Sequence, residues 1–314
     1  MSRLALVVSI GFIIACGGND GTVNDTLTDA ADTSDTSADG SDASDAGGDE
    51  VIEPTLPTSP STAGTEHWVA FMENLSLASN GPPVFAFVVS NPSATATTGT
   101  VEVPRTGFSK PFAVPAHGVV EVVLPDGILY PQVDEVASKL GVRIAAAAPV
   151  EVVAVHYRVY FSDATRVLPT SELGATYVVV TATDLGGMSP SSVVVLAPED
   201  DTTFRITPSA TTSGFLPAGV TQTFTLQRGE TMQFKAGQDL SGTRIEALGG
   251  KRLAVFAGAR QANIACMGAD SHLWDQMLPT ARWGTRHLVM PLAGEGATPV
   301  RLVAGEFKTT VDLS

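Results

Sequence analysis

The run Val150-Glu-Val-Val-Ala-Val-His-Tyr-Arg-Val-Tyr160 decides the fold class of this 314-residue chain. It consists mainly of valine and tyrosine, which favour pleated strands over helices. Turn signals such as Asn91-Pro92, Pro125-Asp-Gly127 and Pro217-Ala-Gly219 occur between similar runs on both sides of it. Those runs are Val84–Ser90, Val101–Pro104, Val119–Leu124, Tyr177–Thr181, Val193–Leu196, Thr221–Leu226 and Leu253–Ala257. The pattern predicts an all-β fold of the sandwich or barrel type.

One segment, Pro131–Leu140, predicts a helix instead. Its apolar residues repeat at i, i+3, i+4 and i+7, with a proline at the start and Gly141 just past the end. We therefore expect a single amphipathic helix among the strands.

The chain also repeats itself. Leu168-Pro-Thr170 with Gly174 matches Leu278-Pro-Thr280 with Gly284, 110 residues later. Units of this length suit β-sandwich modules of about 100 residues and are too long for propeller blades of about 40–45 residues. The repeat predicts tandem sandwich-like modules over residues 65–175 and 176–285. Residues 286–314 would be either the start of a third unit or strands that close onto the second.

The net charge of −15 is concentrated in one segment. Residues 17–64 hold 11 acidic residues and no Lys or Arg, so residues 65–314 carry only −5. A nucleic-acid binder needs a basic face that neutralises phosphate groups, and this charge balance argues against one. No nucleic-acid partner is therefore expected. Asp, Thr, Ser, Ala and Gly dominate the segment, which cannot bury enough apolar surface to offset chain ordering. We expect residues 16–64 to form a disordered acidic stalk.

The N-terminus predicts export. Arg3 precedes the apolar run Leu4–Ile14, which is typical of a signal peptide and too short for a membrane-spanning helix. Ile13-Ile14-Ala15-Cys16 resembles the cleavage box of bacterial lipoproteins. The resemblance implies a signal peptide over 1–15, lipid attachment at Cys16 and anchorage in a lipid membrane. Gly17 favours the outer membrane or cell surface as the location. The alternative is an ordinary secretory signal with a chance cysteine.

Two phrases carry a family resemblance. Phe161–Val179 (FSDATRVLPTSELGATYVV) and His272–Gly284 (HLWDQMLPTARWG) resemble the N-terminal domain of the IgGFc-binding protein family. The resemblance implies an extracellular binding or adhesive module with no catalytic residues. Members of the family carry paired cysteines before the second phrase. Here Cys266 stands alone and Ala269 occupies the expected partner position.

No pattern indicates catalysis. The five histidines lack metal-binding spacings, and no phosphate-binding glycine loop occurs. We therefore predict no catalytic residues, no cofactor and no metal site. Cys266 has no neighbouring positive charge to activate it and is expected to be a buried small residue. Trp274, Arg282 and Trp283 could form an exposed patch for binding. The competing interpretation is core packing at a module junction.

These observations favour a lipid-anchored surface protein that binds an unknown extracellular protein or glycan. A secreted or surface hydrolase of glycans or peptides, and a structural envelope component, are the alternatives.

Overall fold

A computed structural model of the chain describes residues 4–7, 61–74, 81–104, 106–128, 133–183, 189–262, 271–289, 300–306 and 309–311. The proposed lipid site Cys16, nearly all of the expected stalk and Cys266 lie outside the described residues. No helix in the described part of the chain is long and apolar enough to cross a membrane.

The described chain is almost entirely β, and every pairing between its strands is antiparallel. The all-β prediction is confirmed. The strands are β1 (Leu4–Val7), β2 (Ala63–Val69), β3 (Val84–Ser90), β4 (Thr97–Val103), β5 (Phe108–Val114), β6 (Val119–Val123), β7 (Val142–Tyr157), β8 (Asp163–Val167), β9 (Thr176–Val178), β10 (Ser191–Leu196), β11 (Thr202–Thr207), β12 (Gln222–Leu226), β13 (Thr231–Ala236), β14 (Arg244–Ala247), β15 (Ala254–Ala262), β16 (Ser271–Gln276) and β17 (Arg301–Ala304).

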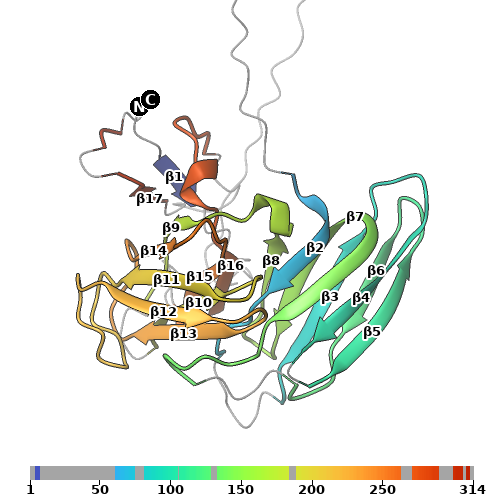
Figure 1. Ribbon diagram of the computed structural model, residues 1–314, viewed down its shortest axis with the longest axis horizontal. Helices are drawn as coiled ribbons and strands as arrows, with labels where there is room; N and C mark the ends of the chain where they lie inside the picture. Colours follow the sequence, from blue (N-terminus) through green and yellow to red (C-terminus); the bar gives the residue numbers. More distant parts are fainter. Residues whose placement is uncertain are drawn as a thin grey trace, which may run out of the picture. The chain divides into compact units, whose positions relative to one another are not determined.

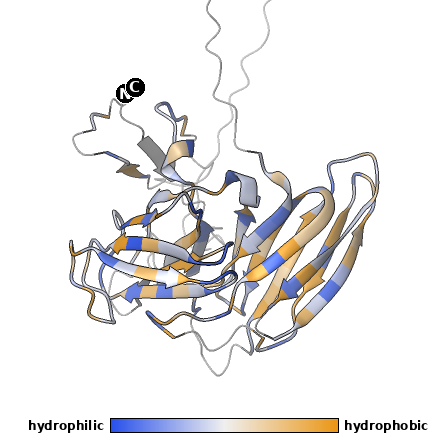
Figure 2. Cartoon of the chain, viewed as in Figure 1, coloured by the Kyte–Doolittle hydropathy of each residue, from blue (hydrophilic) through white to orange (hydrophobic). Residues whose placement is uncertain are grey.

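Strand β7 organises the first sheet because its 16 residues are long enough to pair with four other strands. β4 and β2 pair with its first half, and β3 and β8 with its second half. β5 and β6 complete the sheet as the outer partners of β4 and β3 (Figure 1). Val150, Val152 and Ala154 of β7 point into a hydrophobic core, while the residues between them are partly exposed. Bands of orange and paler residues alternate in the same way along several strands (Figure 2).

The second sheet, ordered β13-β10-β15-β16, is buried on both faces. All six residues of β10 are buried. Val194 and Leu196 pack in the core of the first sheet, whereas Val193 and Val195 pack in a second core. The third sheet, β12-β11-β14-β9, supplies the other side of that second core. A strand covered on both faces needs a continuous apolar run, which explains the sequence Val-Val-Val-Leu over 193–196.

The two Leu-Pro-Thr phrases form equivalent turns. Each contains a short 3₁₀ helix, η2 (Thr170–Glu172) or η3 (Thr280–Arg282), visible as single coils in Figure 1. The prolines that precede them have nearly the same backbone angles: φ −64° and ψ 153° at Pro169, φ −63° and ψ 145° at Pro279. The sequence repeat is therefore also a repeat in the structure.

Each turn places its proline ring against a glycine. Pro169 lies on Gly64 of β2, and Pro279 lies on Gly174, just before β9. A Cβ atom added at either glycine would come closer than 3.0 Å to the ring, a distance that real Cβ contacts essentially never show. Both glycines are thus required by close packing.

An ion-pair cluster joins the first sheet to the loop before β13. Glu66 of β2 pairs with Arg143 at 2.6 Å and with Arg228 at 3.0 Å. The Arg228 guanidinium also lies 5.4 Å from the ring centre of Trp68, within cation–π range. The contacts tie the two repeats together on one surface.

The predicted helix over 131–140 is wrong for its described part, residues 133–140. Glu135 has φ 56°, which a right-handed helix excludes. The Glu135 N–H donates to the Gln233 carbonyl at 2.7 Å, and the Ser138 N–H donates to the Thr231 carbonyl at 2.9 Å. β13 is the edge strand of its sheet, and its open backbone groups hold this segment through two isolated bridges, Asp134 with Gln233 and Ser138 with Thr231.

Candidate binding surface

The buried histidines are part of the hydrophobic core. The rings of His156 and His272 lie 4.8 Å apart, and the His156 ring also lies against Phe71 and Phe85. Burial lowers the pKa of His156 well below its ordinary value and lowers the pKa of His272 to about 4. Both are therefore neutral at physiological pH. In the described residues no group of three or more metal-ligating side chains comes together.

Trp274 is a core residue and does not lie on the surface. Its ring stacks on Phe71 at 4.8 Å and on Phe256 at 5.7 Å between ring centres. Its indole N–H donates to the Ala70 carbonyl at 3.1 Å. With 1% of its surface exposed, Trp274 cannot contact a partner.

Trp283 and Arg282 belong to the η3 turn. Trp283 is 8% exposed, packs beside Val178, and donates its indole N–H to the Leu278 carbonyl at 3.0 Å. Arg282 pairs with Glu172 of the η2 turn at 2.5 Å. The prediction that these residues and Trp274 form an exposed aromatic patch is wrong, because both tryptophans fill the interior beside the repeated turns.

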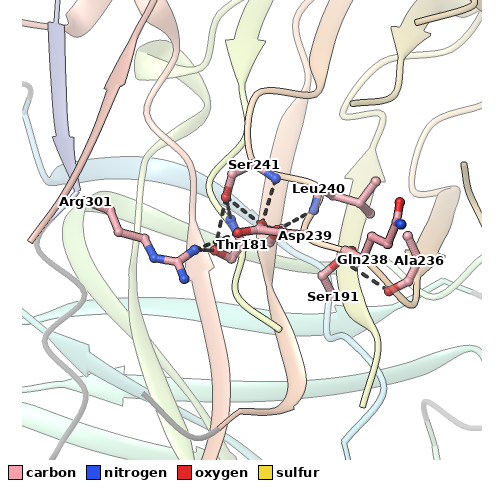
Figure 3. Close-up of polar contacts among 8 residues, drawn as sticks. All are labelled: Thr181, Ser191, Ala236, Gln238, Asp239, Leu240, Ser241 and Arg301. Carbon is pink, nitrogen blue, oxygen red and sulfur yellow. Dashed lines mark hydrogen bonds and ion pairs between the residues drawn. The ribbon is translucent and has the colours of Figure 1, made fainter. Parts of the chain in front are cut away.

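A cluster of hydroxyl and carboxylate groups surrounds Asp239 (Figure 3). The Asp239 carboxylate accepts hydrogen bonds from the hydroxyls of Thr181 at 2.6 Å and Ser241 at 2.7 Å, and it pairs with Arg301 at 2.8 Å. Burial raises its pKa, but these hydrogen bonds and the Arg301 charge outweigh it, so the pKa lies below its ordinary value. The groups satisfy one another and attach β17 to the loop after β13. This arrangement is structural and offers no group poised for chemistry.

β17 and the residue that follows it make further contacts with the second core, with β14 and with β1. Besides Arg301, Val303 packs against the second core, and Arg244 of β14 donates to the Gly305 carbonyl at 3.1 Å. β17 also pairs with β1, residue by residue from Leu4↔Ala304 to Val7↔Arg301.

Phe215 is the strongest candidate for a binding residue. It is 84% exposed, and its backbone has φ 69°, a left-handed conformation that costs about 1–2 kcal/mol for a residue with a side chain. The next residue, Leu216, turns inward and packs against the second core. The chain therefore holds a phenyl ring in solvent at an energetic cost.

Glu135 fixes the turn that carries Phe215. Its carboxylate accepts hydrogen bonds from the Thr212 hydroxyl and, at 3.1 Å, from the Gly214 N–H. Thr212 in turn accepts the Leu216 N–H at 3.0 Å. A Cβ at Gly214 would overlap the Glu135 carboxylate, so a larger residue there would have to displace that side chain. The ring is displayed by a rigid turn.

Two valines flank Glu135 and extend the apolar area. Val133 is 53% exposed and Val136 is 51% exposed. Glu135 bonds to the Phe215 turn, and the two valines are close to Glu135 in the chain. We call Val133, Val136 and Phe215 the Phe215 surface.

The sequence pattern gave little warning of this surface. Phe215 lies in Thr211-Thr-Ser-Gly-Phe-Leu-Pro217, a turn-forming stretch with one aromatic residue. Val133 and Val136 had been assigned to a helix face. The only available signal was an aromatic residue isolated among turn formers, which by itself is common at protein surfaces.

Comparison with known proteins finds a family match over the C-terminal part of the chain. Residues 163–314 match the IgGFc binding protein family, which confirms the resemblance seen in the two Leu-Pro-Thr phrases. A human relative, IgGFc-binding protein, is 29% identical over 153 residues, which are 47% of this chain and 3% of the relative. The chain thus spans a small part of that relative's length. No solved structure matches the chain.

Proposed function

From the match of residues 163–314 to the IgGFc binding protein family, we propose that this chain is a non-catalytic binding protein on the cell surface. Its partner is an extracellular protein, and the Phe215 surface makes the contact. The observation that carries the assignment of the surface is the rigid display of Phe215. Aromatic anchors dominate the energetics of protein interfaces, and a preorganised anchor loses little entropy on binding.

The human relative's name says that it binds the Fc part of immunoglobulin G. The Fc fragment is therefore the first partner to test for this chain. An apolar surface of three side chains suits a protein better than a glycan, which offers mostly hydroxyl groups.

Anchoring would strengthen a modest interaction. Acyl chains on Cys16 contribute about 0.8 kcal/mol per buried CH₂ group, so several chains hold a protein in the membrane. A disordered stalk over 16–64 would keep the folded part clear of the lipid. Many copies on one surface then bind with avidity.

The binding proposal is tested on protein and glycan arrays that include immunoglobulin G and its Fc fragment. The probe is the whole chain with Cys16→Ser. Tyr160→Ser is the matched control for Phe215→Ser, since Tyr160 is also 81% exposed and also has a left-handed backbone, with φ 72°. We expect Phe215→Ser to weaken binding at least tenfold and Tyr160→Ser to leave it unchanged. Blank protein arrays, or equal effects of the two substitutions, would refute the proposal.

The anchoring proposal is tested by cell fractionation. We expect Cys16→Ser to move the protein from the membrane fraction to the soluble fraction. Cys266→Ser, which changes the other cysteine, should leave it in the membrane fraction. A Cys16→Ser protein that stays with the membrane would show that lipid on Cys16 is not the anchor.

A further inference from the structure

One side of strands β6, β3, β7 and β8 points away from the first core. Phe85 and Phe87 of β3 and Val152 of β7 lie in that core, so the residues between them point outward. Six apolar residues on the outer side are partly or largely exposed, and none belongs to a hydrophobic core formed by the described residues. We call these six the valine face: Val84, Val88, Val123, Val153, Val155 and Tyr157.

Backbone pairing makes the valine face continuous across three strands. Val88 of β3 lies directly opposite Val153 of β7. Ala86 of β3 lies between Val123 of β6 and Val155 of β7. Residues directly opposite each other in an antiparallel sheet point to the same side, with Cβ atoms about 4.5–5.5 Å apart. A continuous exposed apolar area of this kind marks an interaction site.

The central row of this face has opposite charges at its two ends. Val88 is opposite Glu121 of β6, and Val153 is opposite Arg166 of β8. Glu121 and Arg166 are both exposed, and neither forms an ion pair with another residue that the structure describes. Three strand spacings of about 4.8 Å place them about 14 Å apart, too far to pair within one copy. The row across the four strands is therefore Glu121, Val88, Val153 and Arg166.

This row is complementary to its own reverse. When two copies stack face to face about a two-fold axis parallel to the strands, Glu121 of one copy lies over Arg166 of the other. Val88 then lies over Val153. An axis perpendicular to the strands would instead put each charge over an identical charge, which is unfavourable. The charges thus select one orientation for a second copy of the chain.

We propose that this chain forms a dimer in which the valine faces of two copies pack together. Sheets stacked in this way lie about 10 Å apart with nearly aligned strands. Burial of the apolar residues supplies the affinity, and the two ion pairs at the rim fix the orientation. Because both copies use the same patch, the contact is isologous and closes at two copies. No residue of the Phe215 surface takes part, so the dimer is independent of the function proposed above.

The first test is the molecular mass as a function of concentration, measured by sedimentation equilibrium on the whole chain with Cys16→Ser. We expect the mass to rise to that of a dimer and no further. Val153→Asp places a carboxylate in the apolar centre and should restore the monomer. Val220→Asp, at a valine that is 45% exposed, and Phe215→Ser should each leave the dimer intact. A monomer at every concentration, or a mass that grows beyond the dimer, would overturn the proposal.

The second test reverses the rim charges, which are exposed and can be changed without disturbing the core. Glu121→Arg places two arginines opposite each other at both ends, so the dissociation constant should rise by about tenfold or more. Adding Arg166→Glu to that variant recreates both ion pairs and should bring the dissociation constant back to within about threefold of its starting value. Glu246→Arg, at an exposed glutamate of β14, should change nothing. A double variant that dimerises no better than Glu121→Arg would show that the two charges do not meet.

Discussion

Thr165 donates a hydrogen bond to the carboxylate of Asp275, which occupies the same position in the second repeat, 110 residues further along the chain. Thr165 lies on β8 and Asp275 on β16. These two strands lie side by side, and hydrogen bonds that involve side chains link them where neighbouring strands of a sheet would use backbone hydrogen bonds. The side-chain carbonyl oxygen of Gln276 accepts a hydrogen bond from the Leu168 N–H at 2.6 Å. The backbone N–H of Gln276 donates to the Thr165 hydroxyl at 3.0 Å. Side chains of each repeat therefore close an edge strand of the other.

Gln276→Leu should destabilise the protein, because Gln276 is 6% exposed and its loss leaves the buried Leu168 N–H without a partner. The expected decrease in the free energy of unfolding is about 1–3 kcal/mol, measured by urea titration. Gln238→Leu changes an exposed glutamine and should have an effect below about 0.5 kcal/mol. Equal midpoints for the two variants would show that the side-chain bridge contributes nothing.

Gly174→Ala should lower stability by about 1–3 kcal/mol, because its Cβ would overlap the Pro279 ring. Gly284→Ala is the control at the same repeat position, where a Cβ has no atom closer than 3.6 Å, and it should be nearly neutral. Thermal unfolding of both variants measures the difference. A destabilised Gly284→Ala variant with an unaffected Gly174→Ala variant would be inconsistent with the packing described above.

Stability should fall as the pH falls below 6.5. Burial lowers the pKa of His67 and His272 to about 4, and that of His156 further below its ordinary value, so these side chains stay neutral in the folded protein while they gain protons in the unfolded chain. As the pH falls from 6.5 toward the pKa of the folded state, each such histidine should lower the free energy of unfolding by up to about 1.4 kcal/mol per pH unit. Asp163 acts in the opposite direction, because burial and the nearby Asp275 raise its pKa to about 7 and the folded state keeps that proton.

His156→Phe tests this pH dependence without leaving a cavity, since the site is already lined by Phe71 and Phe85. Urea titrations between pH 5 and 7 give the slope of the free energy of unfolding against pH. This slope should decrease by up to about 1.4 kcal/mol per pH unit, which corresponds to one proton. His117→Asn, at an exposed residue with φ 50°, should leave the slope unchanged. If His156→Phe leaves the slope as steep as before, burial does not lower the pKa of His156 in the folded protein.

Glu135→Ala should loosen the Phe215 turn, because the Thr212 hydroxyl and the Gly214 N–H lose their acceptor. Hydrogen exchange of the amides over residues 209–221 should become at least tenfold faster. Glu121→Ala removes an exposed glutamate on β6 and should leave exchange in that region unchanged. Unchanged exchange in Glu135→Ala would mean that the turn holds Phe215 without help from the carboxylate.

Local patterns predicted the strands and the repeated turns well. Alternating valines in 150–160 and the continuous run 193–196 each report directly how many faces of a strand are buried. The Leu-Pro-Thr phrases likewise form turns from their own residues, since proline fixes the backbone angle at the start of each. Such features depend on neighbours in sequence and can be read from it.

Features that depend on distant partners could not be predicted. The segment 133–140 has a helical pattern, but the edge of β13, almost 100 residues away, provides hydrogen bonds that hold it in an irregular, non-helical form. The exposure of Phe215 depends on Glu135, 80 residues earlier. Trp274 shows the reverse error: an aromatic residue typical of interfaces is packed between Phe71 and Phe256. Each case requires knowledge of which strands become neighbours.

The double burial of β10 has a consequence for how this protein tolerates mutation and how it melts. Its four apolar residues at 193–196 alternate between two cores, so a polar substitution at any of them damages one core or the other. Unfolding of either core would expose one face of β10 to solvent. The two repeats should therefore melt in a single cooperative transition, with one calorimetric peak, although they recur in sequence as separate units.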